Sequence, residues 1–189
     1  MGPPLRRVSI VGSTGTGKTT YARQLAAILG VPHVELDALA WGPHWTLADA
    51  ETMQARVRES IAGDAWVVDG NYGGRGARQL IWAKADTIVW LDFSLAVIYR
   101  RLWQRTTARI RDRAELWPGT GNRETIRGAF FSRESMFVWA LRTYWRRKRG
   151  YTELFASPDY PHARKLRFRR PAEADAFLEL ERASAARRI

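Results

Sequence analysis

The sequence predicts a three-layer α/β fold, in which helices cover both faces of a five-stranded parallel sheet. Short apolar runs alternate with longer segments of helical periodicity along the chain, and no long linker or internal repeat divides it. Two runs, "AWVVDG" and "DTIVWLDF", are continuously apolar, which is typical of strands that are buried on both faces. We therefore expect the 189 residues to form a single domain.

The first strand is expected at Val8–Val11, followed by a glycine-rich loop and a helix. Tyr21, Leu25 and Ile28 share one face of that helix, and Gly30 is a stop signal. Further strands are predicted at 32–37, ending at Asp37, at 65–70, at 86–93 and, as an edge strand, at 164–169. Further helices are predicted at 47–61, 95–111, 125–147 and 171–185.

The stretch "VGSTGTGKTT" fits the pattern G-x-x-x-x-G-K-[ST] between a strand and a helix. Glycines allow successive backbone N–H groups to point at one anion, and the helix N-terminus favours negative charge. The lysine supplies a compact charge and the following threonine a hydroxyl for magnesium. We therefore predict an ATP phosphate site formed by Gly12, Ser13, Thr14, Gly15, Thr16, Gly17, Lys18, Thr19 and Thr20.

The composition is that of an ordinary globular protein with an excess of arginine. The formal net charge of +12 favours anionic partners such as nucleotides, phosphorylated metabolites or nucleic acid, without selecting among them. The chain has no cysteine, so thiolate metal sites are excluded. No signal-peptide segment or membrane-spanning run is evident, and we expect a cytoplasmic location with no membrane partner. The oligomeric state is not predicted.

Aspartates stand near the ends of three predicted strands, at the same edge of the sheet as the glycine loop. Asp-Gly at 69–70 is also a hairpin signal, but the following segment lacks the alternation of a second strand. We therefore expect Asp69, together with Thr19, to hold magnesium directly or through water. Asp92 is expected to cap or end its strand.

The chain resembles the P-loop kinase family related to adenylate kinase, and in particular the DNA topology modulation proteins. The stretches that carry the resemblance are "GSTGTGKTT", "LDALAWGPHW", "WVVDGNYGG", "ADTIVWLDF", "YRRLWQR" and "FVWALRTYWRRKR", which extend over most of the sequence. The resemblance implies a nucleoside monophosphate kinase-like P-loop NTPase fold. It also implies ATP with Mg²⁺ as cofactor and a small arginine-bearing lid, here at about 100–123.

Arg101, Arg105 and Arg109 recur at helical spacing directly after the fourth predicted strand. A solvated basic face is the simpler interpretation of that spacing. The resemblance, however, places lid arginines at this point of the family's chain. We therefore expect them, with Lys18, to neutralise the phosphoryl group during its transfer.

The sequence identifies the acceptor of the phosphoryl group less clearly than it identifies the ATP phosphate site. Adenylate kinases have Asp-Gly-Phe-Pro-Arg where this chain has Asp69-Gly70-Asn71-Tyr72-Gly73, so the arginine that grips an acceptor phosphate is missing at that point. Arg75 or Arg78 could replace it. The expected acceptor-side helix is 47–61, and the expected acceptor-binding residues are Asp37, Trp41, Arg56, Gly70, Arg75 and Arg78.

Asp37 separates two enzyme hypotheses. A nucleoside monophosphate, which the abundant arginines favour, is already anionic and needs no general base, so Asp37 would bind substrate. A hydroxyl acceptor (a nucleoside, sugar, nucleotide sugar or nucleic-acid end) needs a carboxylate to take its proton, and Asp37 would be catalytic. A third hypothesis is a nucleic-acid-binding ATP-dependent module, suggested by "YWRRKRGY" and "RKLRFRR".

Overall fold

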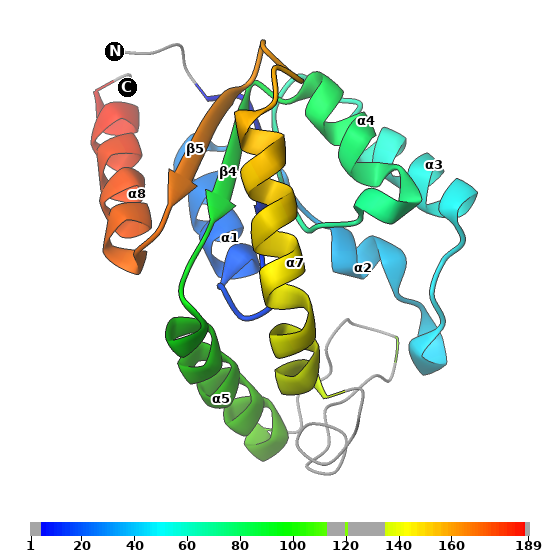
Figure 1. The fold of residues 1–189 in the computed structure, drawn as a ribbon. Coiled ribbons are helices and arrows are strands. Elements are labelled where there is room, and N and C mark those ends of the chain that lie inside the picture. Colours follow the sequence, from blue (N-terminus) through cyan, green and yellow to red (C-terminus); the bar gives the residue numbers. More distant parts are fainter. Residues whose placement is uncertain (1–4, 113–119, 121–134, 188–189) are drawn as a thin grey trace.

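The protein is described by a computed structural model that covers residues 5–112, 120 and 135–187. It confirms a five-stranded, all-parallel sheet between helical layers (Figure 1). The strand order is β2-β3-β1-β4-β5, which makes the last strand an edge strand as predicted. The strands are β1 (Arg7–Gly12), β2 (His33–Glu35), β3 (Trp66–Asp69), β4 (Thr87–Leu91) and β5 (Arg164–Phe168).

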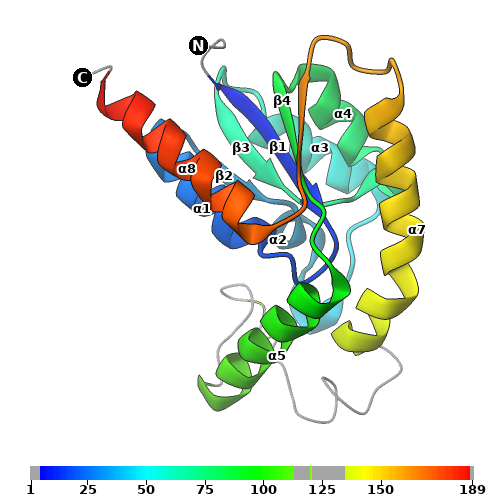
Figure 2. The ribbon, with the colours of Figure 1, turned by 60° about the vertical axis from the view of Figure 1, so that its left-hand side comes forward.

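Helices connect the strands and cover both faces of the sheet. The α-helices are α1 (Lys18–Leu29), α2 (Leu36–Ala40), α3 (Ala50–Ser60), α4 (Ala77–Lys84), α5 (Leu95–Asp112), α7 (Met136–Ala156) and α8 (Pro171–Ala186). Two short 3₁₀ turns are η1 (Pro43–Trp45) and η2 (Gly73–Arg75). Figure 2 shows α1 and α8 together on one side of the sheet, and α3, α4 and α7 on the other.

Alternating strand side chains divide the core into two layers. Along β4, Ile88 and Trp90 pack with α3, α4 and α7, whereas Val89 and Leu91 pack with α1 and α8. All five β4 side chains are buried, which explains why the run is apolar without alternation in the sequence. The parallel register then brings the C-terminal ends of β1, β3 and β4 to one edge, pairing Ile10 with Asp69 and Gly12 with Leu91.

Among the differences between the predicted and the observed elements are two boundaries and one helix. The second strand ends at Glu35, so Asp37 lies in the first turn of α2 and not at a strand end. Helix α4 was not predicted, because its eight residues are too few to establish a clear period. Helix α7 continues to Ala156, beyond the predicted end at 147. Residues 125–134 of that predicted helix, and 113–119 and 121–123 of the predicted lid, lie outside the described residues.

Candidate active site

The glycine loop leads from β1 directly into the N-terminus of α1, as the motif predicts. Gly15 and Gly17 have positive φ angles of 79° and 84°, which disfavour other residues. A Cβ atom on Gly15 would also lie 2.6 Å from Cγ of Leu102 in α5. The loop therefore needs glycine both for its own conformation and for the close approach of α5.

Lys18 folds back over this loop. Its Nζ donates a hydrogen bond of 3.1 Å to the carbonyl oxygen of Ser13. Burial lowers the pKa of Lys18 to about 8, and the negative charges of Asp69 and Asp37 act against that shift. The lysine thus lies in a desolvated position near two carboxylates, and a bound phosphate group would restore its full charge.

Asp69 lies buried at the end of β3 and joins two other side chains. Its Oδ1 accepts a 3.0 Å hydrogen bond from the Thr19 hydroxyl, and its Oδ2 lies 2.8 Å from Nε2 of His33. A hydroxyl and a carboxylate are oxygen groups that suit magnesium when phosphates and water complete its coordination. Within the described residues no larger cluster of metal-ligating side chains occurs. The predicted pair, Thr19 and Asp69, is therefore brought together in a form that fits a nucleotide-bound Mg²⁺.

Asp37 is held by a tyrosine that the sequence analysis did not select. Tyr72 donates a 2.6 Å hydrogen bond from its hydroxyl to Oδ1 of Asp37. Asp37 does not cap the helix that contains it, because Glu35 is the N-cap residue of α2 and makes no side-chain cap bond. Among the described residues, Oδ2 of Asp37 accepts no hydrogen bond. This oxygen is available to a bound molecule.

Arg147 of α7 is a further site residue that sequence reasoning missed. Burial lowers its pKa, while the Tyr151 hydroxyl, Asp37 and Tyr72 act in the opposite direction, so its guanidinium lies near all three. Its Cζ lies 5.7 Å from the ring centroid of Trp139. The sequence "WRRKR" gives no signal that this arginine, among its basic neighbours, faces inward.

Asn71 links the glycine loop to α7. Its amide donates to the carbonyl oxygen of Gly12 at 2.8 Å, and its Oδ1 accepts from the backbone N–H of Gly12 at 3.3 Å. The same Oδ1 accepts a 2.8 Å hydrogen bond from Tyr151, which lies one helical turn after Arg147. The specific stretch "DGNYGG" therefore supplies a clamp on the loop through Asn71 and a partner for Asp37 through Tyr72.

Two of the three predicted acceptor-side arginines donate to backbone carbonyls, and the third acts on Tyr151. Nη1 of Arg56 donates to the carbonyl oxygen of Leu39, and Nη1 of Arg75 donates to that of Ala48, both at 2.6 Å. Arg78 lies over the ring of Trp82, with Cζ 5.5 Å from its centroid.

The other two predicted acceptor-side residues pack close to α2. Trp41, the C-cap residue of this helix, contacts Trp45 edge-on. Gly70 has a φ of +138°, and a Cβ there would lie 2.6 Å from Cβ of Leu36, so it serves close packing of α2 on β3.

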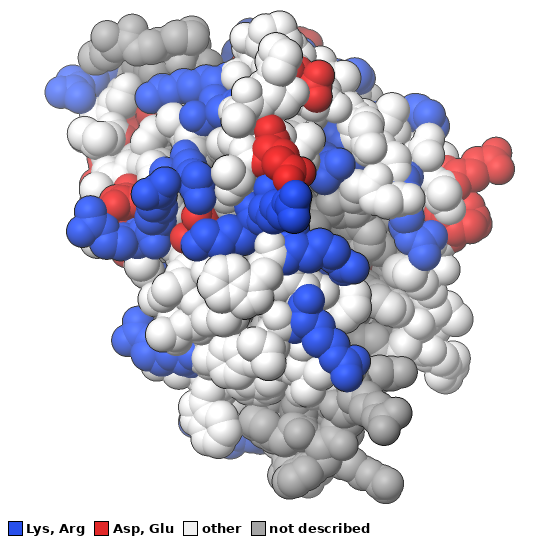
Figure 3. Space-filling model, in the orientation of Figure 1, with Lys and Arg blue, Asp and Glu red and all other residues white. Residues whose placement is uncertain are grey.

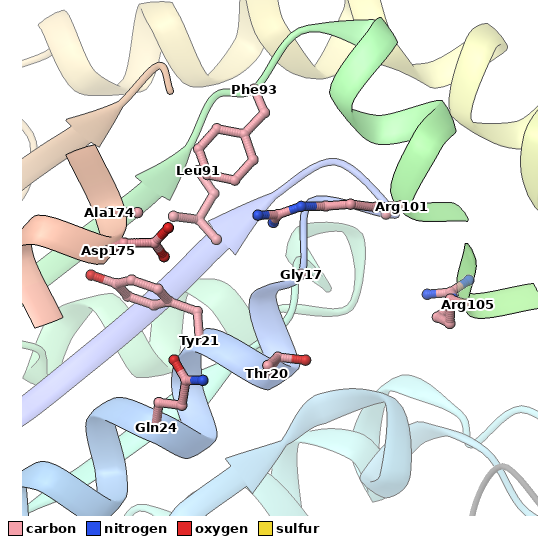
Figure 4. Close-up of a pocket in the computed structure, with 11 residues that line it drawn as sticks. Gly17, Thr20, Tyr21, Gln24, Leu91, Phe93, Arg101, Arg105, Ala174 and Asp175 are labelled. Atoms are coloured by element: carbon pink, nitrogen blue, oxygen red, sulfur yellow. The ribbon is translucent and has the colours of Figure 1, made fainter. Parts of the chain in front are cut away.

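The α5 arginines are only partly brought to the glycine loop. Arg101 donates a short hydrogen bond to the carbonyl oxygen of Thr16, and its Cζ lies 5.1 Å from the ring centroid of Phe93. Arg101 and Arg105 line a cavity beside the loop (Figure 4). Arg105 also lowers the pKa of Lys18, which places its charge near that lysine. Arg109 lies one turn further along α5 and is not among the residues that line the cavity.

The two basic segments noted in the sequence meet on one face. Figure 3 shows lysine and arginine side chains in a band over β5 and α7. Within this band, Arg167 makes two hydrogen bonds to Asp92, of 3.0 and 2.7 Å, and Nζ of Lys148 lies 3.8 Å from the same carboxylate. Asp92 directly follows β4, as expected, and neutralises part of the band.

A profile described as the ATPase family associated with various cellular activities (AAA) matches residues 8–68. This segment runs from β1 through the glycine loop and α1 to β3, which is less than half of the chain. No curated protein sequence matches the chain.

Solved structures match over nearly the whole length. A gluconokinase from Sinorhizobium meliloti 1021 has a TM-score of 0.54 and 19% identity, with 96% of this chain and 92% of that chain covered. The shikimate kinase from Acinetobacter baumannii in complex with shikimate has a TM-score of 0.58 and 15% identity, with 95% and 94% covered. The fold is that of a P-loop NTPase. At these identities the matches establish the P-loop fold and do not decide between adenylate kinase-like and other P-loop subgroups.

None of the described helices is long and apolar enough to cross a membrane.

Proposed function

We propose that this P-loop protein is an ATP-dependent kinase that transfers the γ-phosphoryl group of Mg·ATP to a hydroxyl of a small, anionic acceptor. The observation that carries the proposal is the arrangement of Asp37. One of its oxygens is fixed by Tyr72 and the other accepts no hydrogen bond from the described residues. A carboxylate held in this way beside the P-loop lysine suits the removal of a proton from an attacking hydroxyl.

The other site residues have roles in positioning the nucleotide. The P-loop amides and Lys18 bind the β- and γ-phosphates, and Thr19 and Asp69 hold the magnesium ion. The ion, when bound, neutralises charge that develops on the phosphate oxygens. Arg105 adds a second positive charge near Lys18. Arg109 is the third lid arginine predicted from the sequence, and we include that role in the proposal.

The transfer exchanges one phosphorus–oxygen bond for another and moves one proton. The acceptor oxygen forms a bond to the γ-phosphorus, the bond between that phosphorus and the β–γ bridging oxygen breaks, and ADP leaves. Oδ2 of Asp37 takes the hydroxyl proton as the new bond forms. Tyr72 donates to Oδ1 and so keeps the carboxylate oriented toward the acceptor.

Arg147 supports an anionic acceptor. Among the described residues its guanidinium makes no hydrogen bond or ion pair, and its neighbour there is the Trp139 ring. A partly buried guanidinium with unused N–H donors favours a carboxylate or phosphate, which can accept two parallel hydrogen bonds. Its proximity to Asp37 and Tyr72 supports an anionic group on the same substrate as the reacting hydroxyl.

The similar structures fit this proposal, because two of them are kinases named for gluconate and shikimate, which are hydroxyl-bearing acids. The preference for a nucleoside monophosphate in the sequence analysis depends on the abundance of arginines around the expected acceptor side. Arg56 and Arg75, however, are engaged with backbone carbonyls. A monophosphate acceptor therefore becomes the alternative, with Arg147 gripping its phosphate.

ADP formation from Mg·ATP tests the proposal directly. The acceptor panel consists of shikimate, D-gluconate, neutral D-glucose, the nucleoside monophosphates and an oligonucleotide with a 5′-hydroxyl end, against an acceptor-free background. We expect a hydroxy acid to stimulate turnover, and Lys18→Ala to abolish it while Lys84→Ala, on the exposed end of α4, retains it. Turnover with nucleoside monophosphates alone, or only acceptor-independent hydrolysis, would contradict the proposal.

A further inference from the structure

A second cavity, of about 350 Å³, opens where the β4–α5 connection, α7 and the end of β5 meet. It is lined by Asp92, Ser94, Lys148, Arg167 and Arg169, none of which lines the cavity beside the P-loop. Its volume is within the range of about 300–1,000 Å³ that is common for small-molecule sites. The three basic residues belong to the segments "YWRRKRGY" and "RKLRFRR" and have no role in the proposed phosphoryl transfer.

Asp92 holds two of these cations in place. The residue is only 6% exposed, and its Oδ2 accepts hydrogen bonds of 3.0 Å and 2.7 Å from Nε and Nη2 of Arg167. Its Oδ1 lies 3.8 Å from Nζ of Lys148. The Arg167 guanidinium also lies over the Trp90 ring, with Cζ 4.2 Å from the ring centroid. A guanidinium from β5 and an ammonium from α7 are thus oriented before any ligand binds.

The cavity carries more positive than negative charge. Its lining contains three cationic side chains and one carboxylate, so two positive charges are in excess. Arg167 directs two of its five N–H groups at Asp92, which leaves three for a ligand. The Arg169 guanidinium makes no hydrogen bond or ion pair with any described residue, while its backbone N–H donates to Glu173 at 2.8 Å. Because like charges that converge on one cavity repel each other, an anion bound there is favourable.

The N-terminus of α5 adds to this positive potential. Ser94 lines the cavity and directly precedes the helix. The first turn of α5 contains no acidic residue, so the partial positive charge of the helix N-terminus is not neutralised there. The Ser94 Oγ accepts from the backbone N–H of Val97 at 3.5 Å, which leaves the hydroxyl proton available to a ligand. Hydroxyl, ammonium and guanidinium donors therefore converge from three parts of the fold.

We propose that this cavity is a second anion site, separate from the P-loop, which binds a small molecule that carries a phosphate group. A phosphate monoester presents three terminal oxygens and a charge of about −1.5 to −2 at neutral pH, which matches the excess charge and the donors of Lys148, Arg167 and Arg169. A carboxylate ligand would offer one charge and two oxygens. The rest of the cavity has room for the organic part of the molecule.

The cavity does not suit a nucleic-acid strand. Proteins bind single strands through a groove of cations together with aromatic rings on which the bases stack. The Trp90 ring beside this cavity is 2% exposed and is covered by Arg167. The Tyr144 ring is also buried, and Nζ of Lys148 lies over it. Neither ring is available to a base, so a small phosphate-bearing molecule is the better match.

Calorimetric titrations of the full chain with inorganic phosphate and with D-glucose 6-phosphate, at constant ionic strength, test the site. All are made in a Lys18→Ala background, which removes the contribution of the P-loop. Arg169→Gln and Lys148→Gln, which leave the pair of Asp92 and Arg167 intact, should each weaken both ligands about ten- to a hundredfold. Arg164→Gln, at the exposed start of β5 and outside the cavity, removes the same charge and should change little. Thermal melting checks that each variant is folded.

The sugar phosphate should bind at least as tightly as inorganic phosphate, and tighter binding of inorganic phosphate would overturn the organic ligand in favour of the free ion. If neither probe bound in the Lys18→Ala background, the second site would be refuted. It would also be refuted if Arg164→Gln weakened binding as much as Arg169→Gln, since the effect would then be one of overall charge. A single-stranded oligonucleotide without a terminal phosphate is the third probe. Binding of this probe that both cavity variants weaken would assign the residues to a nucleic-acid surface instead.

Discussion

The hydroxyl of Tyr72 donates a 2.6 Å hydrogen bond to Oδ1 of Asp37, and this contact joins α2 to the loop that follows β3. The second carboxylate oxygen accepts no hydrogen bond from the described residues. Burial raises the pKa of Tyr72, with Asp37 adding to the effect, so the tyrosine remains a donor throughout the neutral range. The two residues thus act as one unit in the proposed proton transfer.

Tyr72→Phe is expected to lower kcat about three- to tenfold, because the carboxylate loses the bond that orients it. Steady-state kinetics with the accepted hydroxy acid measure the effect. In an Asp37→Asn background the same change should have no further effect on kcat. Tyr99→Phe, which loses a comparable 2.9 Å bond to the carbonyl oxygen of Phe137, is the matched control. An equal loss in both backgrounds would show that Tyr72 acts independently of Asp37.

The Lys18 amine is expected to make the free energy of unfolding and the affinity for ATP depend on pH. Its folded-state pKa of about 8 lies below the ordinary value of 10.5, so between these values the unfolded chain binds more protons. The free energy of unfolding should therefore rise with pH across this window, and the charged lysine is unfavourable for folding below pH 8. ATP binding restores the charge, so ATP affinity should fall as the pH rises above 8.

Calorimetric titrations of ATP between pH 7 and pH 10 check this expectation, with proton uptake read from buffers of different ionisation enthalpy. Lys18→Arg should retain binding without this pH dependence, because arginine remains charged. If the ATP affinity of the parent protein did not change up to pH 10, Lys18 would not be the titrating group on which ATP binding depends.

Arg105→Ala should lower kcat by about 10³-fold or more while changing ATP affinity little, because lid arginines meet charge that develops in the transition state. Arg100→Ala, at an exposed arginine five residues earlier on α5, should leave both values near those of the parent protein. Turnover and ATP binding are measured separately. A change in apparent ATP affinity alone, with kcat unchanged, would contradict the lid role of Arg105. It would indicate that this face of α5 is an ordinary solvated surface.

Arg147→Gln should raise the KM for an anionic acceptor about ten- to a hundredfold, because a charge-assisted hydrogen bond is lost. The KM for a neutral acceptor, and the KM for ATP, should change little. Arg146→Gln is the control, since Arg146 is the exposed neighbour on the same helix. A rise in the KM for ATP instead would place Arg147 on the donor nucleotide.

The sheet and its P-loop could be predicted because both depend on local patterns. Continuous apolar runs mark buried strands, and the glycine motif marks the strand-to-helix turn regardless of what packs around it. The pairing of Thr19 with Asp69 follows from the parallel register, which places strand ends together. The edge position of β5 also agrees with its mixture of basic and apolar residues, none of which is fully buried.

The acceptor side could not be predicted in the same way. The rotation of α7 decides that Arg147 faces Asp37, and packing of Tyr151 and Tyr144 against other elements sets that rotation. Asn71 and Tyr72 lie in a loop without periodicity, so their partners depend on how α2 and α7 approach. The predicted strand end at Asp37 lies two residues beyond the observed end at Glu35, because the sequence "VELDALA" suits a strand end and a helix start equally.

The central claim is that Asp37 takes a proton from a hydroxyl acceptor, and kcat of Asp37→Asn at saturating acceptor tests it most directly. The side chain keeps its size, and Asp64→Asn, on an exposed turn before β3, is the matched control. We predict that kcat falls about 10²–10⁴-fold in Asp37→Asn, with the KM for the acceptor within a fewfold of the parent value. An unchanged kcat combined with a raised KM would contradict the account, because Asp37 would then bind the acceptor without accepting its proton.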